Sequence, residues 1–237
     1  MQLELTKLKQ AMMAQVDRNN MASNNLANMG TTGFKKDELF FQTLDNEMDI
    51  SQSMTHGTDF KQGDLSETGN PLDIALSGNG FFTIERGNEQ VYTRNGSFKI
   101  DNDGVIRTRS GLPVMGEGGW INVFSDSGQP KSIKITEKGE VFADDVYIDK
   151  LDVSNFEDPE KLTKIGGNMF TADRDALLYQ VEEPNVKQGF LESSNVNAAQ
   201  EMIDLVELQR QFESMQKVIR SIDDSYKTAI NKVGIYR

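Results

Sequence analysis

A regular run of apolar residues near the C-terminus constrains this chain more than any other feature. From residue 205 the spacing alternates between three and four, and the residues are Leu205, Leu208, Phe212, Met215, Ile219, Ile222, Tyr226, Ala229 and Val233. This heptad spacing predicts a helix with one apolar stripe that packs along another long helix. Isolated helices are only marginally stable in water, so the predicted helix needs a partner. Its own domain and another subunit are both candidates.

The N-terminal segment predicts a second helix, over about residues 3–28, which ends at Gly30 and the turn Thr31-Thr32-Gly33. Its two seven-residue series are more polar than the C-terminal stripe, and they are Leu5, Met12, Asn19, Leu26 and Leu8, Gln15, Ala22, Met29. Buried asparagines can fix the register of paired helices. Solvent-facing asparagines would have no such effect, and the sequence leaves both alternatives open.

Between the two helices the sequence predicts a connecting segment and a β domain. Residues 34–64 contain Phe34, Phe40, Phe41 and Phe60, which is too aromatic a composition for a flexible linker, so we expect a partly extended connection. From residue 65, short apolar runs alternate with turn signals at Gly78-Asn79-Gly80, Asn95-Gly96 and Asp101-Asn102-Asp103-Gly104. Turns about 8–12 residues apart are typical of a compact antiparallel β domain.

The fold class predicted from these patterns is α+β, with N- and C-terminal heptad-patterned helices flanking a central antiparallel β domain. The expected boundaries are residues 1–33 for the first helix, 34–64 for the connection, 65–190 for the β domain and 191–237 for the second helix. Residues 191–197 (LESSNVN) offer several side chains that can cap the start of that helix.

Composition excludes several classes of protein. The net charge of −12 over 237 residues argues against nucleic acid as a partner. No apolar run approaches the roughly 20 residues that a membrane-spanning helix needs, so no membrane insertion is expected. The start, MQLELTKLKQ, alternates charged and apolar residues, unlike a cleaved secretory signal. The chain contains no cysteine, which rules out disulfides and thiolate chemistry.

No motif in the sequence predicts an active site, a cofactor or a metal. His56 is the only histidine and has no nucleophile motif beside it. The Asp101–Gly104 turn resembles the opening of a calcium loop, but Leu112 stands where the twelfth ligand would be a glutamate. Gly78-Asn79-Gly80 lacks the third glycine of a dinucleotide fingerprint.

Paired carboxylates at Asp144-Asp145 and Asp223-Asp224 are predicted to be solvated. Trp120 is predicted to lie in the β core, with a sugar-binding platform as the alternative. We therefore expect no enzyme.

Three segments together resemble the flagellar basal-body rod and hook family. The first is Ser23-Asn24-Asn25-Leu26-Ala27-Asn28, followed by Thr31-Thr32-Gly33-Phe34-Lys35. The second runs from Gly69-Asn70-Pro71-Leu72-Asp73 through Gly78-Asn79-Gly80-Phe81-Phe82 to Tyr92-Thr93-Arg94-Asn95-Gly96-Ser97-Phe98. The third is Gly189-Phe190-Leu191-Glu192-Ser193-Ser194-Asn195-Val196-Asn197, with Gln209-Arg210-Gln211-Phe212-Glu213 downstream. Each segment alone is moderately specific, and their order strengthens the match.

The resemblance implies a structural subunit of the bacterial flagellar basal-body rod. Such a subunit polymerises through its terminal helices into the axial drive shaft that transmits torque, and it associates with copies of itself and with other rod subunits. The resemblance further implies export through the flagellar type III apparatus without a cleaved signal peptide, to the periplasm-spanning rod of the basal body. Within the family, the short segment between Phe34 and Lys61 favours the proximal rod subunit over the distal one.

The residues predicted to carry assembly are packing residues rather than catalytic ones. Helix seams would be filled by Leu26, Leu205, Leu208, Phe212, Met215, Ile219 and Ile222. Three asparagines at the end of the first helix would bind backbone groups or neighbouring subunits, and they are Asn24, Asn25 and Asn28. Four glycines would set turns: Gly33, Gly78, Gly80 and Gly96.

Two alternative functions remain open from the sequence. The first is a secreted carbohydrate-binding or hydrolytic β domain with helical oligomerisation ends, and it predicts a concave polar site around Trp120. The second is a soluble coiled-coil adaptor, whose helices should associate without the β domain.

Overall fold

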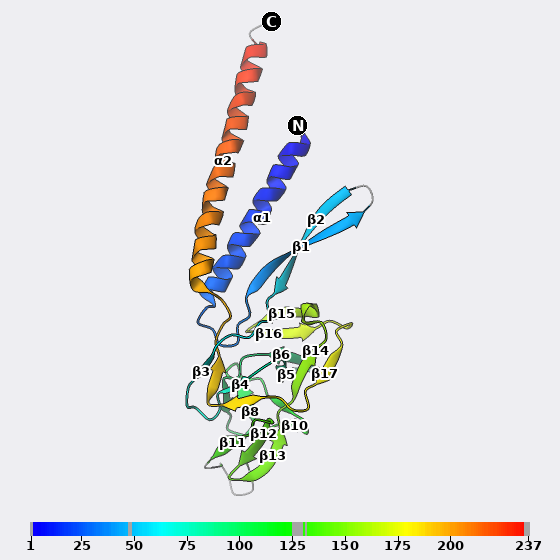
Figure 1. Ribbon diagram of the computed structural model, residues 1–237, viewed down its shortest axis with the longest axis vertical. Helices are drawn as coiled ribbons and strands as arrows, with labels where there is room; N and C mark the ends of the chain where they lie inside the picture. The colour runs from blue at the N-terminus through cyan, green and yellow to red at the C-terminus, as the bar shows by residue number, and fades with distance from the viewer. Residues whose placement is uncertain (1, 47–48, 125–129, 131, 235–237) are drawn as a thin grey trace. The chain divides into compact units, whose positions relative to one another are not determined.

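The computed structural model describes residues 2–46, 49–124, 130 and 132–234. The chain divides into two compact units (Figure 1). The helical unit consists of residues 1–27, 39–55 and 197–237, and the β unit consists of residues 28–38 and 56–196. The architecture is two helices and a large β region between them in sequence, as the α+β prediction requires.

The two helices of the helical unit are α1 (Gln2–Ala27) and α2 (Ala198–Gly234). They run antiparallel, and α2 extends beyond the start of α1 (Figure 1). The side chain of Asn197 accepts hydrogen bonds from the backbone N–H groups of Ala199 and Gln200, at 3.1 and 3.2 Å. These bonds satisfy two of the first N–H groups of α2, which have no partner inside the helix. The predicted cap lies in the LESSNVN segment.

The segment predicted to be a partly extended connection contains two long strands. These are β1 (Asp37–Asn46) and β2 (Asp49–Thr58), and they pair in a two-stranded sheet. The side chains of Phe40 and Phe41 lie outside the described part of this hairpin. Phe34 and Phe60 are described in the β unit, where Phe34 is buried and Phe60 packs edge-on against Phe81 at 5.6 Å between ring centroids.

The β unit is built around a six-stranded sheet with the order β15-β16-β6-β5-β14-β17. Each described strand pair in this unit is antiparallel, as predicted. The strands of the large sheet are β5 (Phe81–Arg86), β6 (Glu89–Thr93), β14 (Val153–Phe156), β15 (Leu162–Gly166), β16 (Met169–Ala172) and β17 (Leu178–Gln180). A 3-10 turn at Pro159–Lys161 precedes β15.

Smaller sheets complete the β unit. One has three strands, β11 (Ile133–Ile135), β12 (Glu140–Ala143) and β13 (Val146–Lys150). The two-stranded sheets are β3 (Leu65–Glu67) with β19 (Phe190–Glu192), β4 (Ile74–Leu76) with β18 (Val186–Gln188), β7 (Phe98–Ile100) with β8 (Ile106–Thr108), and β9 (Met115–Gly116) with β10 (Gly119–Trp120). The pairs β3–β19 and β4–β18 join the start of the β unit to its end.

Two clusters of buried side chains form the core of the β unit. The larger one is mainly aliphatic, with Ile74, Ile84 and Ile106 among its fully buried members. The smaller one is aromatic and contains Phe81, Tyr92, Phe156, Leu162 and Phe170. Its rings meet edge to face, the geometry that aromatic pairs prefer. This core makes the β unit a packed body in its own right.

The predicted turns are present, but the turn at Asn95-Gly96 does not connect two paired strands. Asp101 accepts hydrogen bonds from the N–H groups of Asp103 and Val105, and it turns the chain between β7 and β8. At Asn95-Gly96 the flanking strands β6 and β7 do not pair with each other. A Cβ on Gly96 would lie 1.6 Å from the Ile74 carbonyl oxygen. Close backbone approach, rather than a positive φ, therefore requires glycine at this position.

The prediction that Trp120 lies in the core is wrong. Its side chain is 53% exposed, and its indole N–H donates a hydrogen bond to Glu85. The Arg107 guanidinium lies over the ring, 6.0 Å from its centroid. Because β10 is a two-residue edge strand, a side chain on it has neighbours on few sides. The guanidinium thus lies over one face of the indole ring.

Candidate assembly site

The register of the helical unit is set by polar groups inside an otherwise apolar contact. Gln15 donates its side-chain amide to the Leu208 carbonyl and to the Gln211 side chain, both at 3.1 Å. In the last turn of α1, Asn25 donates to a carboxylate oxygen of Glu201 at 3.5 Å, with both residues buried. A buried polar pair costs free energy when it is mispaired, so these contacts oppose sliding of one helix along the other.

The structure places the predicted assembly residues as follows. On α2, all six seam residues whose side chains are described are half-buried, namely Leu205, Leu208, Phe212, Met215, Ile219 and Ile222. Tyr226, Ala229 and Val233 lie in α2, but their side chains fall outside the described ones. At the end of α1, Asn25 is buried, Leu26 and Asn28 are half-buried, and Asn24 is exposed. Asn25 thus contacts α2 directly, through Glu201.

A second apolar stripe on α2 was not predicted. Met202, Ile203 and Val206 are 50%, 59% and 55% exposed, and they line a shallow groove with Glu207 and Arg210. At about 100° per residue, Ile203 and Val206 lie on the side of the helix opposite the seam. The sequence signal was available, because Ile203 and Val206 are three residues apart and interleave with the heptad run. The heptad pattern does not include them, because it describes only the seam face of the helix.

Side chains do not fill all of the space between α1 and α2 along the predicted seam. A groove of about 430 Å³ lies between α1 and α2, lined by Gln15, Val16, Asn19, Leu208, Gln209, Phe212, Glu213 and Gln216. Val16 on α1 is 45% exposed. Protein interiors are close-packed, with few voids larger than a water molecule. The two helices of one chain therefore do not bury all of the apolar surface that they carry.

In the β unit, charged residues from all three family-like segments meet in one buried cluster. Glu192 accepts a hydrogen bond from the Lys35 ammonium at 2.6 Å and from the Arg94 guanidinium at 3.4 Å. The Gly63 N–H donates to the same carboxylate at 3.0 Å. Lys35 and Glu192 are each 1% exposed and Arg94 is 3% exposed. This cluster ties together segments that are 157 residues apart in sequence.

Backbone carbonyls accept further hydrogen bonds from the cluster, whereas the buried Arg94 Nε has no partner among the described residues. Lys35 also donates to the Lys61 carbonyl at 2.6 Å, and Arg94 donates to the Gly78 carbonyl at 2.7 Å. Burial lowers the pKa of Lys35, and the neighbouring Glu192 carboxylate opposes that shift. Burial likewise lowers the pKa of Arg94, again opposed by Glu192. Two buried cations thus share one buried carboxylate, which makes Glu192 the residue on which the cluster depends.

Glycine and asparagine bring these segments close enough for the cluster to form. Gly33 has φ +67°, and a Cβ there would lie 2.5 Å from the Asn95 backbone nitrogen. Its own N–H donates to the Glu192 carbonyl at 2.8 Å. Asn195 accepts from the Lys36 N–H at 2.8 Å and donates to the Asp59 carbonyl at 2.8 Å. The motifs therefore interlock around the ends of the β unit.

Lys35, Arg94 and Glu192 lie within the family-like segments, but no role is predicted for them from the sequence. A usable signal was present for Arg94 and Glu192, each of which is a lone charge in an uncharged stretch, but not for Lys35, which is followed by Lys36 and Asp37. Only their proximity in the fold shows that the three charges form one cluster.

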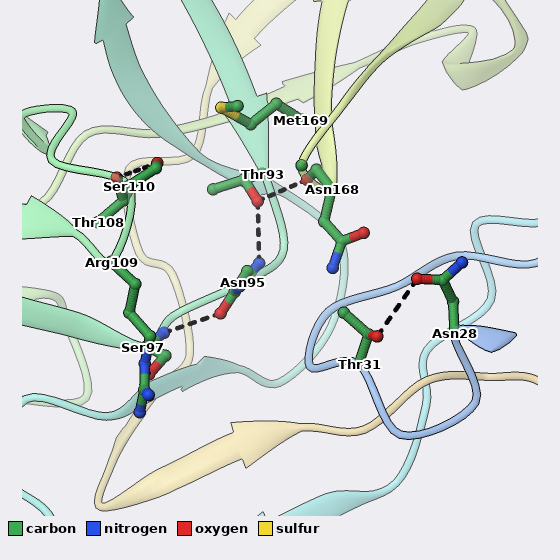
Figure 2. Close-up of a pocket in the computed structure, with 11 residues that line it drawn as sticks. Asn28, Thr31, Thr93, Asn95, Ser97, Thr108, Arg109, Ser110, Asn168 and Met169 are labelled. Atoms are coloured by element: carbon green, nitrogen blue, oxygen red, sulfur yellow. Dashed lines mark hydrogen bonds between the residues drawn. The ribbon is translucent and has the colours of Figure 1, made fainter.

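A polar pocket of about 370 Å³ lies elsewhere in the β unit (Figure 2). Its walls are mainly hydroxyl and amide side chains that bond to the protein itself. Thr93 donates to the Asn168 carbonyl at 2.7 Å and accepts from the Asn95 N–H at 3.1 Å, and Thr31 donates to Asn28 at 3.3 Å. None of the lining residues is a carboxylate, histidine or cysteine, so the pocket holds no acid–base pair.

The structure also places the residues that the sequence offers no reason to regard as catalytic or metal-binding. His56 is exposed near the end of β2. Asp144 and Asp145 have φ of +48° and +66° and form the tight turn between β12 and β13. Among the described residues, no group of three or more potential metal ligands is found, and no described helix is long and apolar enough to cross a membrane. The described part of the molecule presents packing surfaces and apolar stripes, which are typical of a structural protein that associates with others.

Comparison with known proteins identifies the family. Three family models match this chain: the flagellar basal body rod FlgEFG protein C-terminal at residues 187–232, the flagellar hook protein FlgE/F/G D1 domain at 75–143, and the flagella basal body rod protein at 8–35. These regions contain most of both helices and part of the β unit.

Full-length relatives agree. The chain is 28% identical over 224 residues to the flagellar basal-body rod protein FlgF of Caulobacter vibrioides, which covers 90% of this chain and 91% of the relative. It is 30% identical over 231 residues to FlgF of Mesorhizobium japonicum, covering 94% and 95%. It is 30% identical over 241 residues to FlgG of Bacillus subtilis, covering 88% and 90%. The chain belongs to the flagellar basal-body rod protein family, and the carbohydrate-binding alternative is not favoured.

Proposed function

We propose that this chain is a rod subunit that assembles through α1 and α2, which lie against the helices of neighbouring subunits to build the axial, torque-transmitting shaft. One observation carries the proposal: α2 presents apolar side chains on two opposite faces. Its seam faces α1, whereas Met202, Ile203 and Val206 remain exposed. A helix with apolar residues on more than one side is typical of the interior of a larger helical assembly.

The lengths of the helices support the same proposal. At about 1.5 Å per residue, the 37 residues of α2 extend roughly 55 Å, whereas the 26 residues of α1 extend roughly 39 Å. Because Gln15 pairs with Leu208 and Gln211 in an antiparallel arrangement, the start of α1 is level with α2 near Ile222. The last turns of α2 therefore extend past their partner within the chain. Contacts that repeat without closing into a ring build a filament or tube.

The proposal is tested by placing charge on the exposed stripe. The double substitution Ile203→Asp and Val206→Asp should leave the β unit folded, because both side chains are exposed in the subunit. It should abolish incorporation into basal bodies, because each carboxylate would have to be buried between subunits. The matched control is Ile203→Leu with Val206→Leu, which keeps the apolar surface.

The measurements are swimming motility, the protein content of purified basal bodies and the thermal unfolding of the purified subunit. We expect the aspartate variant to unfold at the parental temperature but to be missing from basal bodies, and the leucine variant to behave as the parent. Normal incorporation of the aspartate variant would refute assembly through this stripe.

The family assignment places the protein in the basal body of the bacterial flagellum and among other rod components. We further propose that it occupies the proximal part of the rod, supported by the short segment between Phe34 and Lys61, and that the flagellar type III apparatus exports it without cleavage. Mass spectrometry of the protein from purified basal bodies should then detect the peptide that begins MQLELTK. Cells that lack the protein should make no distal rod, and a complete distal rod would contradict the proximal position.

A further inference from the structure

One edge of the six-stranded sheet is open. β17 is the last strand in the sheet order and lies at the outer side of β14 (Figure 1). The Val181 N–H donates to the Val153 carbonyl at 2.8 Å, and the Glu157 N–H donates to the Leu177 carbonyl at 3.2 Å. Since backbone groups alternate in direction along a strand, the N–H and C=O groups of Leu178 and Gln180 point away from β14. No described strand pairs with them.

The exposed edge is apolar. Leu177, Leu178 and Tyr179 are 64%, 43% and 47% exposed, although they are consecutive large side chains. Exposed hydrophobic residues that occur singly need no explanation, but three in a row at the start of an edge strand form a surface that can template another strand.

The opposite edge of the same sheet shows that this exposure is not a general property of the fold. At that edge, β15 contains an irregularity between Lys164 and Gly166 that interrupts regular pairing. The Lys164 ammonium donates to the Lys35 carbonyl at 2.8 Å and forms an ion pair with Asp37, so residues 35–37 contact this edge. Natural sheets protect edges with bulges, inward-facing charges and covering segments. β15 carries these devices, whereas β17 has none among its described residues.

The charges around β17 indicate what kind of partner fits. Exposed Asp173 and Asp175 precede the strand and exposed Glu182 follows it, with Arg174 as the only nearby cation on these flanks. The chain as a whole carries a net charge of −12. A second copy pairing through the same edge would bring acidic flanks together, and like-charge juxtaposition disfavours wrong partners. A strand with basic residues at its ends complements this edge.

We propose that β17 is a docking edge that receives an extended, basic-flanked segment of a partner polypeptide, which adds to the sheet as a seventh strand. The outward N–H and C=O groups of Leu178 and Gln180 supply the hydrogen-bond ladder, and Leu177, Leu178 and Tyr179 supply the apolar contacts. Acidic residues on both flanks select the basic ends. This interaction is independent of the helices through which the subunit assembles.

The experiment uses the full chain and a synthetic peptide of alternating valine and threonine with lysines at both ends. Amide hydrogen exchange should slow at least about tenfold at Leu178 and Gln180 when the peptide saturates the protein. The amide of Tyr179 should change little, because it already faces β14. Binding is measured in parallel by fluorescence anisotropy, with a peptide that carries glutamates at its ends as the charge control.

The variant Leu178→Pro removes an outward N–H without breaking a bond to β14, so the sheet should remain intact. We expect it to weaken peptide binding by about tenfold or more, whereas Leu178→Val, which keeps the N–H, should bind nearly as the parent. A peptide methylated on alternate backbone nitrogens should not bind. The proposal is overturned if the peptide gives no protection at Leu178 and Gln180, or if binding is indifferent to methylation and to Leu178→Pro. Tighter binding of the glutamate peptide, or self-association lost in Leu178→Pro, would refute the basic partner.

Discussion

The strongest test of the fold is the substitution Glu192→Gln, which removes the one carboxylate that Lys35 and Arg94 share. All three side chains are buried, with Glu192 only 1% exposed. Removing one partner of a buried ion pair leaves an uncompensated charge and typically costs about 3–5 kcal/mol. Glutamine keeps the size of the side chain, so the loss arises from charge rather than from a cavity.

The share of this loss that comes from Lys35 has an upper limit, which follows from the chemistry of the lysine. If burying its charge becomes too costly, the lysine can lose its proton, and burial already lowers its pKa. Deprotonating an ordinary lysine at neutral pH costs about 5 kcal/mol, since each pKa unit corresponds to about 1.36 kcal/mol. We therefore expect a destabilisation of about 3–5 kcal/mol, a large part of the total stability of a domain of this size.

The assay is urea denaturation followed by the fluorescence of Trp120, the only tryptophan, which reports on the β unit alone. The matched control is Glu183→Gln, which makes the same chemical change in an exposed pair, Lys138–Glu183 at 3.1 Å. Exposed pairs contribute about 0–1 kcal/mol, so this control should unfold nearly as the parent. If both variants lose the same stability, the cluster does not hold the segments together and the reasoning fails.

Three further predictions concern the β unit and α2. Gly96→Ala should lower the free energy of unfolding in urea by at least about 3 kcal/mol, because its Cβ would meet the Ile74 carbonyl. The control Gly87→Ala, whose Cβ would meet no atom within 4 Å, should cost only about 1–2 kcal/mol because of its positive φ. Equal losses in the two variants would contradict this reasoning. Burial raises the pKa of Asp152, so its contribution to stability is fully present below the unfolded pKa near 3.9 and is lost as pH rises through the folded pKa. Asp152→Asn should therefore gain stability over the parent at neutral pH and lose that advantage below about pH 4; an advantage that does not depend on pH would exclude titration of this carboxyl. Asn197→Ala should speed hydrogen exchange in the first turn of α2 and cost about 1 kcal/mol there, and unchanged exchange would show that the cap is not needed.

How much of this protein could be predicted from its sequence depends on the range of the interactions. The two helices follow from local patterns: the heptad spacing on α2, the absence of proline and internal glycine, and Asn197 at the cap. The turn at Asp101 follows in the same way from its own side chain. Such features depend on residues a few positions apart, and propensity and periodicity describe those contacts well.

Other features depend on segments that only the fold brings together. Gln15 meets Leu208 across 193 positions, and Lys35 meets Glu192 across 157. Whether an asparagine of α1 is buried or exposed could not be predicted, and the structure buries Asn25 beside Glu201 but leaves Asn24 exposed. Trp120 is exposed because its strand lies at an edge, and β17 is open because of its place in the sheet order. The sequence alone determined the elements and the family resemblance. The tertiary structure decided which charges are buried together and which apolar surfaces stay exposed, because burial depends on neighbours that are distant in the chain.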